Sequence, residues 1–121
     1  MRNRTILLLL ALLMATPASA ASVIIQRVID GDTAVTTTGE RIRLACLDAP
    51  ERGKRGAAAA TRSLREMVQG REVGIRRITR DRYGRTVGEL YSSGKNVGEE
   101  LVNSGNAWIY QRYAYQCSWA K

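Results

Sequence analysis

The stretch Arg41-Ile-Arg-Leu-Ala-Cys-Leu47, which runs directly into Asp48-Ala-Pro-Glu51, decides the fold that we predict for this chain. Ile42, Leu44 and Cys46 alternate with arginines and an alanine, which is the period-two pattern of a strand with one buried face. The proline ends the strand, because it cannot donate to a sheet ladder and it favours an extended conformation in the residue before it. We therefore expect the two acids on either side of it to project from a fixed corner between strand and loop.

The residues around this strand predict four more strands, because they are rich in β-branched side chains and are separated by turn residues. Together with residues 41–47, the predicted strands are residues 23–29, 32–38, 72–79 and 86–91. The strands at residues 23–29, 32–38 and 41–47 follow one another through short turns and so form a meander. A meander of this size is typical of a small, strongly coiled barrel.

Two helices are expected to pack on these strands. Residues 57–68 carry an apolar stripe at helical spacing. The stripe consists of Ala57, Ala60, Leu64, Met67 and Val68. A shorter helix follows Asn96, which forms an N-cap pair with Glu99. The order of three strands, a helix, two strands and a helix predicts an α+β domain that is mainly β, a five-stranded Greek-key barrel of the OB type.

The first 20 residues have the pattern of a signal peptide. Two arginines precede an unbroken apolar run at residues 6–15, and Ala18-Ser-Ala20 is a small-residue cleavage site. Cleavage after Ala20 would leave one domain, residues 21–121. The alternative, a permanent N-terminal anchor, is disfavoured because the apolar run is shorter than the roughly 20 residues that span a bilayer. We therefore expect a secreted or periplasmic protein.

Residues 21–121 are basic, with 17 Lys and Arg against 11 Asp and Glu and hence a net charge of +6. A basic surface attracts polyanions, of which nucleic acid comes first and anionic lipid or cell-wall polymer second. Arginine outnumbers lysine by 14 to 3 in this region. Guanidinium groups favour two-pronged contacts with phosphate, although codon usage in a GC-rich genome would account for the same bias.

The chain contains no histidine. This absence excludes Ser-His-Asp and Cys-His nucleophilic catalysis, histidine-dependent zinc sites and two-histidine ribonuclease chemistry. Hydrolysis by this chain would therefore have to use carboxylates, arginines and a hard metal ion.

The two cysteines, Cys46 and Cys117, are permitted to form a disulfide in an exported protein. We expect instead that they stay apart. Cys46 shares the apolar face of Ile42 and Leu44 in the predicted strand, so a buried free thiol is the preferred interpretation.

Acidic and arginine side chains fall at strand ends and turns in three separate clusters. The clusters are Asp30 to Thr33, Arg43 with Asp48 and Glu51, and Tyr83 to Arg85. Taken singly, each has an ordinary structural explanation, since Asp-Gly is a common hairpin turn and an arginine on a strand is usually solvated. A barrel can, however, bring all three clusters together.

Together the clusters supply what phosphodiester hydrolysis needs. Arg43 and Arg85 offer two-pronged donors to the oxygens that gain charge in the transition state. Asp32 and Asp48 can hold a hard divalent cation, with backbone carbonyls and waters completing its shell, and such a sparse site suits Ca²⁺. Glu51 can accept a proton from the attacking water.

Four motifs occur in order along the chain. They are Val28-Ile-Asp-Gly-Asp-Thr33, Arg43-Leu-Ala-Cys-Leu-Asp-Ala-Pro-Glu51, Asp81-Arg-Tyr-Gly-Arg85 and Leu101-Val-Asn-Ser-Gly-Asn-Ala-Trp108. With these motifs, residues 23–113 resemble the staphylococcal-nuclease-like (thermonuclease) family. The resemblance implies Ca²⁺-dependent hydrolysis of DNA and RNA at the 5′-oxygen of the phosphodiester, which leaves 3′-phosphorylated products. We expect single-stranded or frayed regions to be preferred, and the protein to be a monomer.

The same resemblance assigns roles to individual residues. It implies that Asp32, Asp48 and the backbone carbonyl of Ala49 bind Ca²⁺. Arg43 and Arg85 match the catalytic arginines that bind the phosphate. Ala49 stands where the founding enzyme has threonine, which removes a hydroxyl near the metal but keeps the carbonyl that binds it.

Four further positions match a catalytic residue and three substrate-binding residues of the family. Glu51 matches the glutamate described as the general base. Arg82 and Tyr83 match positions near the bound nucleotide, and Tyr113 matches a tyrosine that stacks on a base.

The resemblance also implies a third helix after Tyr113, covering one end of the barrel. Residues 114–121 are too few to form it fully, so we expect this helix to be missing and the barrel end to be exposed. Trp119 is a side chain that could cap the gap. Residues 107–109 are expected to pack back onto the barrel as an apolar staple.

Two other functions fit parts of the pattern. The first is a non-catalytic OB-fold module that binds nucleic acid and is weakened by the missing C-terminal helix. The retained acids and arginines argue against it. The second is a cell-envelope domain drawn to anionic polymers by charge alone, which the net charge supports and no motif does.

Overall fold

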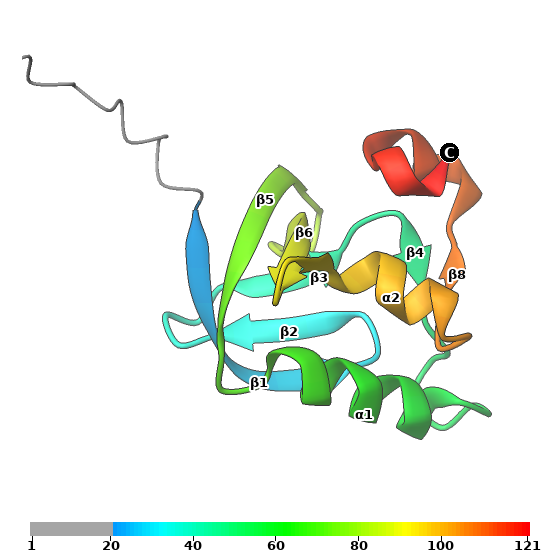
Figure 1. Ribbon diagram of the computed structural model, residues 1–121, viewed down its shortest axis with the longest axis horizontal. Coiled ribbons are helices and arrows are strands. Elements are labelled where there is room, and N and C mark those ends of the chain that lie inside the picture. Colours follow the sequence, from blue (N-terminus) through cyan, green and yellow to red (C-terminus); the bar gives the residue numbers. More distant parts are fainter. Residues whose placement is uncertain (1–20) are drawn as a thin grey trace, which may run out of the picture.

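The computed structural model describes residues 21–121, and the predicted signal peptide at residues 1–20 lies outside the described residues. The described residues form a barrel flanked by helices (Figure 1). Its long strands are β1 (Ser22–Asp30), β2 (Thr33–Thr36), β3 (Arg41–Leu44), β5 (Glu72–Arg80) and β6 (Thr86–Ser92). Three short strands are β4 (Leu47–Asp48), β7 (Lys95–Asn96) and β8 (Trp108–Ile109). All five predicted strands are confirmed, although β2 and β3 end earlier than expected.

The barrel closes because β3 pairs with two strands. The sheet order is β3-β2-β1-β5-β6-β7, and each of these neighbours is antiparallel. In addition, β3 pairs in parallel with β6, with Ile42 opposite Thr86 and Arg43 opposite Val87. Closure removes the open edges that β3 and β6 would otherwise present. This closed five-stranded barrel confirms the predicted OB-like fold.

Two α-helices pack on the barrel, as predicted. Helix α1 (Ala57–Val68) runs along β1, and α2 (Val97–Asn103) packs against β6 and α1 (Figure 1). The side chain of Asn96 caps α2 by accepting a hydrogen bond from the amide of Glu99 at 3.1 Å, which confirms the predicted capping pair. Within residues 21–121, no helix combines the length and the apolar character needed to cross a bilayer.

One hydrophobic core fills the barrel and the inner faces of both helices. Ile42 and Leu44 of β3 are fully buried, whereas Arg41, the first residue of the strand, is exposed, as the alternation predicts. Leu64 of α1 and Leu101 of α2 are fully buried in the same cluster. Each such side chain contributes about 1.5 to 3 kcal/mol of hydrophobic stabilisation.

The residues after α2 cover the barrel end that we expected to be exposed. Strand β8 pairs with β4, and the chain then forms two short 3-10 helices, η1 (Gln111–Gln116) and η2 (Ser118–Ala120). They bury Ala114, Cys117 and Ala120 in a second hydrophobic cluster beside β4 (Figure 1). No third α-helix occurs within residues 21–121, as predicted. The expectation of an exposed barrel end is nevertheless wrong, because small side chains let short 3-10 turns pack closely there.

Trp119 anchors this C-terminal segment to the barrel. Its ring packs against both hydrophobic clusters, and its Nε1 donates to the carboxylate of Glu89 at 2.7 Å. Glu89 is buried and also accepts hydrogen bonds from Arg76, Tyr91 and Asn96. Burial alone would raise the pKa of Glu89, but these donors together hold it below its usual value. A charged, fully bonded carboxylate therefore ties the segment to β6.

Cys46 and Cys117 form a disulfide, so the expectation of a free thiol at Cys46 is wrong. Their Cα atoms lie 6.3 Å apart, within the usual range for a disulfide. Strand β3 ends at Leu44, and Cys46 has a φ of 72° in the turn that follows. The cysteine has therefore left the strand alternation on which the expectation was based.

Trp108 is a second departure from expectation. Ala107 is buried and Ile109 packs against the second cluster, but the side chain of Trp108 is 53% exposed. Successive residues of a strand point to opposite faces, so Trp108 and Ile109 of β8 cannot both pack inward. The predicted apolar staple is thus confirmed for its outer two residues and wrong for Trp108.

Glu40, in the turn before β3, contacts both β5 and β6. Its carboxylate accepts two hydrogen bonds from the guanidinium of Arg77, at 2.7 and 2.9 Å, and one from the hydroxyl of Thr86 at 2.7 Å. The contact with Arg77 is the main reason that the pKa of Glu40 falls from 4.5 to about 2, although burial opposes it. The ion pair therefore stays charged at neutral pH.

We predict that reduction of the disulfide destabilises the protein by about 2 to 4 kcal/mol, because the bond closes a long loop, with a sequence separation of 71. Urea unfolding followed by circular dichroism, with and without reductant, measures this loss. The Cys117→Ala variant should match the reduced protein and should no longer respond to reductant. Equal stability of the oxidised and reduced protein would contradict the pairing.

We predict that Glu40→Gln lowers the free energy of unfolding at neutral pH by about 1 to 2 kcal/mol, because the charged pair with Arg77 is lost. The folded-state pKa is depressed, so the contribution of Glu40 is full above pH 4.5 and disappears as the pH falls towards 2. The stability gap between the two proteins should therefore close over that interval. A gap that stays constant in urea titrations across this range would rule out the charge as its cause.

Candidate active site

Arg43 gathers two carboxylates at the corner where β3 ends. Its Nη2 lies 2.5 Å from Oδ1 of Asp48 and 3.5 Å from Oδ2 of Asp32. Its Nη1 donates to the main-chain carbonyls of Leu44 and Leu47, at 2.7 and 2.9 Å. One guanidinium thus fixes the path of the chain from β3 to β4 and compensates two acids at once.

Asp32 is the more enclosed of the two acids, with a side chain that is 14% exposed. Its carboxylate accepts the hydroxyl of Thr33 at 3.0 Å and the amide of Ala49 at 3.3 Å, while its own amide donates to Asp30 at 3.1 Å. Burial raises the pKa of Asp32, and this effect outweighs the attraction of Arg43. The charged form of Asp32 is therefore short of positive partners in this structure.

Helix α1 packs directly on the turn that carries Asp32. A Cβ atom at Gly31 would lie 2.7 Å from Cβ of Ala60 and 2.8 Å from Cβ of Ala49. Carbon atoms do not approach so closely, so glycine is required between the turn, the helix and the corner. Ala60 of α1 and Ala49 of the corner thus both pack against the turn that carries Asp32.

The turn between β5 and β6 positions a second arginine. Oδ2 of Asp81 accepts a hydrogen bond from Nε of Arg85 at 2.7 Å, while Oδ1 accepts the amides of Tyr83 and Arg85, each at 3.0 Å. Burial alone would raise the pKa of Asp81, but these donors hold it below its usual value. Among the described residues, the terminal nitrogens of Arg85 bind no acceptor, so they remain available to a phosphate.

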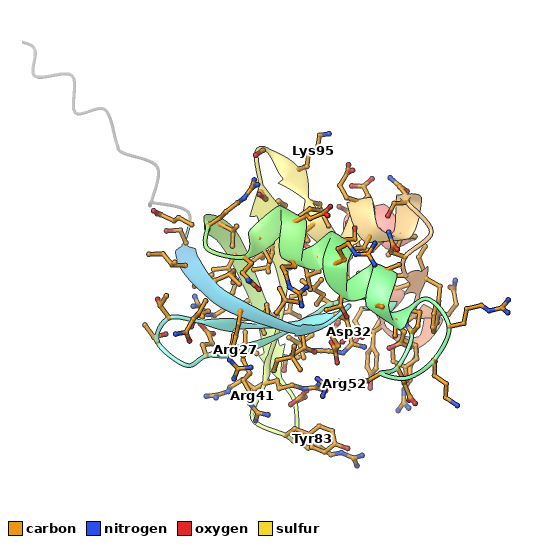
Figure 2. All side chains as sticks on the ribbon, turned by 90° about the horizontal axis from the view of Figure 1, so that it is seen from below. Arg27, Asp32, Arg41, Arg52, Tyr83 and Lys95 are labelled. Carbon is orange, nitrogen blue, oxygen red and sulfur yellow. A yellow bond between two sulfur atoms is a disulfide. The ribbon has the colours of Figure 1, made fainter. Side chains whose placement is uncertain are left out.

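Five predicted site residues line one pocket of about 630 Å³, which we call the site pocket. They are Arg43, Arg82, Tyr83, Arg85 and Tyr113. The ring of Tyr83 is 58% exposed and lies under both neighbouring guanidinium groups, with its centre 4.9 Å from Cζ of Arg82 and 5.4 Å from Cζ of Arg85. Figure 2 shows Tyr83 projecting from the end of the barrel, with Asp32 further in beside α1.

The remaining predicted residues, Asp32, Asp48, Ala49 and Glu51, do not line the site pocket. Asp32 and Asp48 are joined to it through Arg43. Glu51 is exposed on the loop after β4, and its carboxylate forms no hydrogen bond or ion pair with the residues that the structure describes. The structure therefore joins the two acids to Arg43, and Arg43 and Arg85 line the same pocket. Glu51 has a carboxylate without a partner among the described residues. The catalytic roles of these residues stay predictions.

Comparison with known families agrees with this arrangement. Residues 41–120 match the family described as staphylococcal nuclease homologue. The chain belongs to this family. The resemblance predicted from the four sequence motifs is thereby confirmed, and the match includes β3, the corner with Arg43, and the turn with Arg85.

Several individual members of the nuclease homologue family are similar to this chain. An uncharacterized endonuclease of Haemophilus influenzae is 34% identical over 124 residues, covering 95% of this chain and 70% of the relative. An uncharacterized endonuclease of Escherichia coli O157:H7 is 38% identical over 93 residues, covering 74% and 61%. A micrococcal nuclease of Shigella flexneri is 35% identical over 101 residues, covering 74% and 58%. The chain thus spans about three fifths of the length of the latter two relatives.

The acids at the corner fit a hard divalent cation. Both carboxylates reach the same nitrogen of Arg43, and burial raises the pKa of Asp32, so an added cation would stabilise its charged form. Within residues 21–121, no three acidic or cysteine side chains converge on one point. A cation would therefore be held by Asp32 and Asp48 together with a main-chain carbonyl such as that of Ala49 and with water, all of them oxygen ligands.

Several residues at the site were missed by sequence reasoning. Asp81 fixes Arg85, and its position four residues earlier in a tight turn was a usable signal. Tyr110, Arg112 and Gln116 line the site pocket from the C-terminal segment. No local pattern could have placed these three, because their positions depend on contacts between distant parts of the chain. Strand β8 pairs with β4, the amide of Tyr110 donates to the carbonyl of Cys46 at 2.9 Å, and the carbonyl of Gln116 accepts from Arg76 at 2.7 Å.

We predict that Gly31→Ala destabilises the protein by about 1 to 3 kcal/mol, because the added methyl group overlaps Ala60 and Ala49. Gly74→Ala is the matched control, since its Cβ would meet its nearest neighbour, Tyr91, at 3.4 Å, which is an ordinary contact. Thermal and urea unfolding of the two variants measure the difference. A loss at Gly31 no larger than that at Gly74 would show that α1 does not pack on the turn as described.

Proposed function

We propose that this protein is an exported, Ca²⁺-dependent nuclease that hydrolyses the phosphodiesters of DNA and RNA and leaves 3′-phosphorylated products. The observation that carries the proposal is that Arg43 holds Asp32 and Asp48 at one corner and lines the site pocket together with Arg85. The chain also belongs to the nuclease homologue family. Two relatives named endonuclease and one named micrococcal nuclease support the same reaction class.

The two arginines supply positive charge where the phosphate gains negative charge. Arg43 and Arg85 both line the site pocket, one from β3 and the other from the turn before β6. Asp81 holds Arg85 by Nε alone, so its terminal nitrogens have no acceptor among the described residues and are free to bind phosphate oxygens. The terminal nitrogens of Arg43 are already bonded to the acids and main-chain carbonyls of the corner, so Arg43 contributes mainly its charge. Donors that are fixed before the reaction stabilise a charged transition state without reorganisation, and each is typically worth about 10²- to 10³-fold in rate.

Glu51 is the proposed proton acceptor for the attacking water. A general base needs a free carboxylate, and that of Glu51 is exposed and forms no bond with the described part of the chain. Asp32 and Asp48 are unsuited to this role because Arg43 already binds both. A bound Ca²⁺ would polarise the phosphate and the water, and the acid pair with the carbonyl of Ala49 would hold it.

The aromatic side chains of the site pocket are proposed to bind bases. Tyr83 presents an exposed ring backed by two guanidinium groups, and Tyr113 presents a ring supported by an edge contact with Tyr110, at 5.1 Å between centres. Stacking on aromatic rings needs unpaired bases and is tolerant of sequence. We therefore propose a preference for single-stranded or frayed nucleic acid, without sequence specificity.

We predict that Glu51→Gln lowers kcat by about 10²- to 10⁴-fold and that Arg85→Ala lowers it by about 10²- to 10³-fold, because proton transfer and charge stabilisation are lost. Release of acid-soluble nucleotides from single-stranded DNA in Ca²⁺ measures both. Glu66→Gln and Arg62→Ala, which make the same chemical changes on the exposed face of α1, should retain the wild-type rate.

Unchanged turnover in both Glu51→Gln and Arg85→Ala would overturn the site assignment. Circular dichroism of each variant shows whether its fold is intact. Binding of single-stranded DNA that persists in chelator, with no cleavage by the folded wild-type protein at any Ca²⁺ concentration, would favour a non-catalytic nucleic-acid-binding module instead.

A further inference from the structure

A second pocket, of about 610 Å³, lies next to the site pocket, and we call it the outer pocket. It is formed by the turn between β2 and β3, by the C-terminal half of β5 and by the start of β6. Thr79 and Arg80 line both pockets, so the two are continuous along the end of β5. None of the residues assigned to metal binding or catalysis lines the outer pocket.

The outer pocket has an excess of positive charge. Its charged residues are Glu40, Arg41, Arg77 and Arg80. Glu40 and Arg77 neutralise each other through a two-pronged contact. Within residues 21–121, neither Arg41 nor Arg80 forms an ion pair with a carboxylate. Two arginine charges are therefore uncompensated in this pocket.

These two arginines are held in place by the turn that forms the site pocket. Nη2 of Arg41 donates to the carbonyl of Tyr83, and Nη2 of Arg80 donates to the carbonyl of Gly84 at 3.3 Å. The same turn presents the ring of Tyr83 and the guanidinium of Arg85 to the site pocket. Figure 2 shows Arg41 beside Tyr83 at one side of the molecule, with Lys95 at the opposite side.

We infer that the outer pocket binds the phosphodiester backbone of the same nucleic-acid strand, one or more nucleotides away from the phosphate in the site pocket. Each arginine uses one nitrogen on a carbonyl and keeps other N–H groups for a phosphate oxygen. A strand carries a charge at every nucleotide, so a strand longer than the site pocket presents further phosphates to the surface around it. The outer pocket is continuous with the site pocket through Thr79 and Arg80 and offers these phosphates the uncompensated charges of Arg41 and Arg80.

This inference rests on the proposed function, since it extends the path of that substrate. It assigns Arg41 and Arg80 to backbone contacts that position the strand, and it assigns them no part in the chemical step. Contacts of this kind depend on charge and carry no base specificity. The affinity for long single strands should therefore depend on these two residues and on the salt concentration.

The test is binding of a fluorescently labelled 20-nucleotide single-stranded DNA, measured by anisotropy in chelator over a series of salt concentrations. Arg41→Gln/Arg80→Gln should weaken binding about tenfold and should reduce the slope of log K against log salt by about 1.4, which corresponds to two phosphate contacts on a single strand. Arg41→Lys/Arg80→Lys keeps the charge and should stay within about threefold of wild type.

The matched control is Arg62→Gln/Lys95→Gln, which removes the same two charges from exposed positions outside both pockets. It should change the affinity by less than about threefold and should leave the salt slope near that of wild type. Equal effects of the two glutamine pairs, or no effect of either, would overturn the inference. So would a lysine pair as weak as the glutamine pair, because the loss would then reflect a disturbed turn.

The outcomes separate this inference from the proposed nuclease function. Binding that depends on Arg41 and Arg80, in a wild-type protein that never cleaves in Ca²⁺, would support the outer pocket and overturn the nuclease proposal. Ca²⁺-dependent cleavage by the wild-type protein, together with unchanged DNA binding in the Arg41→Gln/Arg80→Gln variant, would support the nuclease proposal and overturn the outer-pocket inference.

Discussion

The contact of Arg43 with two carboxylates is the interaction on which the rest of the site depends. Asp32 lies in the turn between β1 and β2 and Asp48 lies in β4, and like charges held this close would repel each other without a shared cation. The same guanidinium binds the carbonyls of Leu44 and Leu47, so it also sets the direction in which the chain leaves the barrel. The same side chain therefore both compensates the charge of the acids and fixes the path of the main chain.

Three neighbouring parts of the fold hold this corner in place. The parallel pairing of β3 with β6 closes the barrel immediately before it, and α1 packs against Gly31 on one side. On the other side, the disulfide from Cys46 to Cys117 and the hydrogen bond from Trp119 to Glu89 fix the C-terminal segment. That segment supplies part of the site pocket, which links the stability of the barrel end to substrate contact.

Local patterns in the sequence predicted the elements well. The alternation of Ile42 and Leu44, the stripe on α1 and the Asn96 cap are set by neighbours within a few residues, and all three are confirmed. The predicted barrel also indicated that the clusters with Asp32, Arg43 and Asp48 would meet, because strand ends and turns lie together at the rim of a barrel.

The features that failed depend on contacts between distant parts of the chain. Cys46 leaves the strand through a positive φ that no periodic pattern reveals, and it pairs with Cys117. Its carbonyl accepts the amide of Tyr110 at 2.9 Å, and this contact, together with the pairing of β4 and β8, holds Tyr110 at the site pocket. Trp108 lies on a two-residue strand that pairs with the equally short β4, and so short a strand leaves no alternating pattern to read in the sequence.

The most direct measurement is mass spectrometry of the products that the purified protein forms from a single-stranded oligonucleotide of defined sequence, in Ca²⁺ and in excess chelator. If the corner of Asp32, Asp48 and Arg43 serves metal-dependent phosphodiester hydrolysis, fragments ending in a 3′-phosphate will appear in Ca²⁺ and will be absent in chelator. An oligonucleotide that stays intact with the folded protein under both conditions, or fragments that form equally well in chelator, would contradict this account.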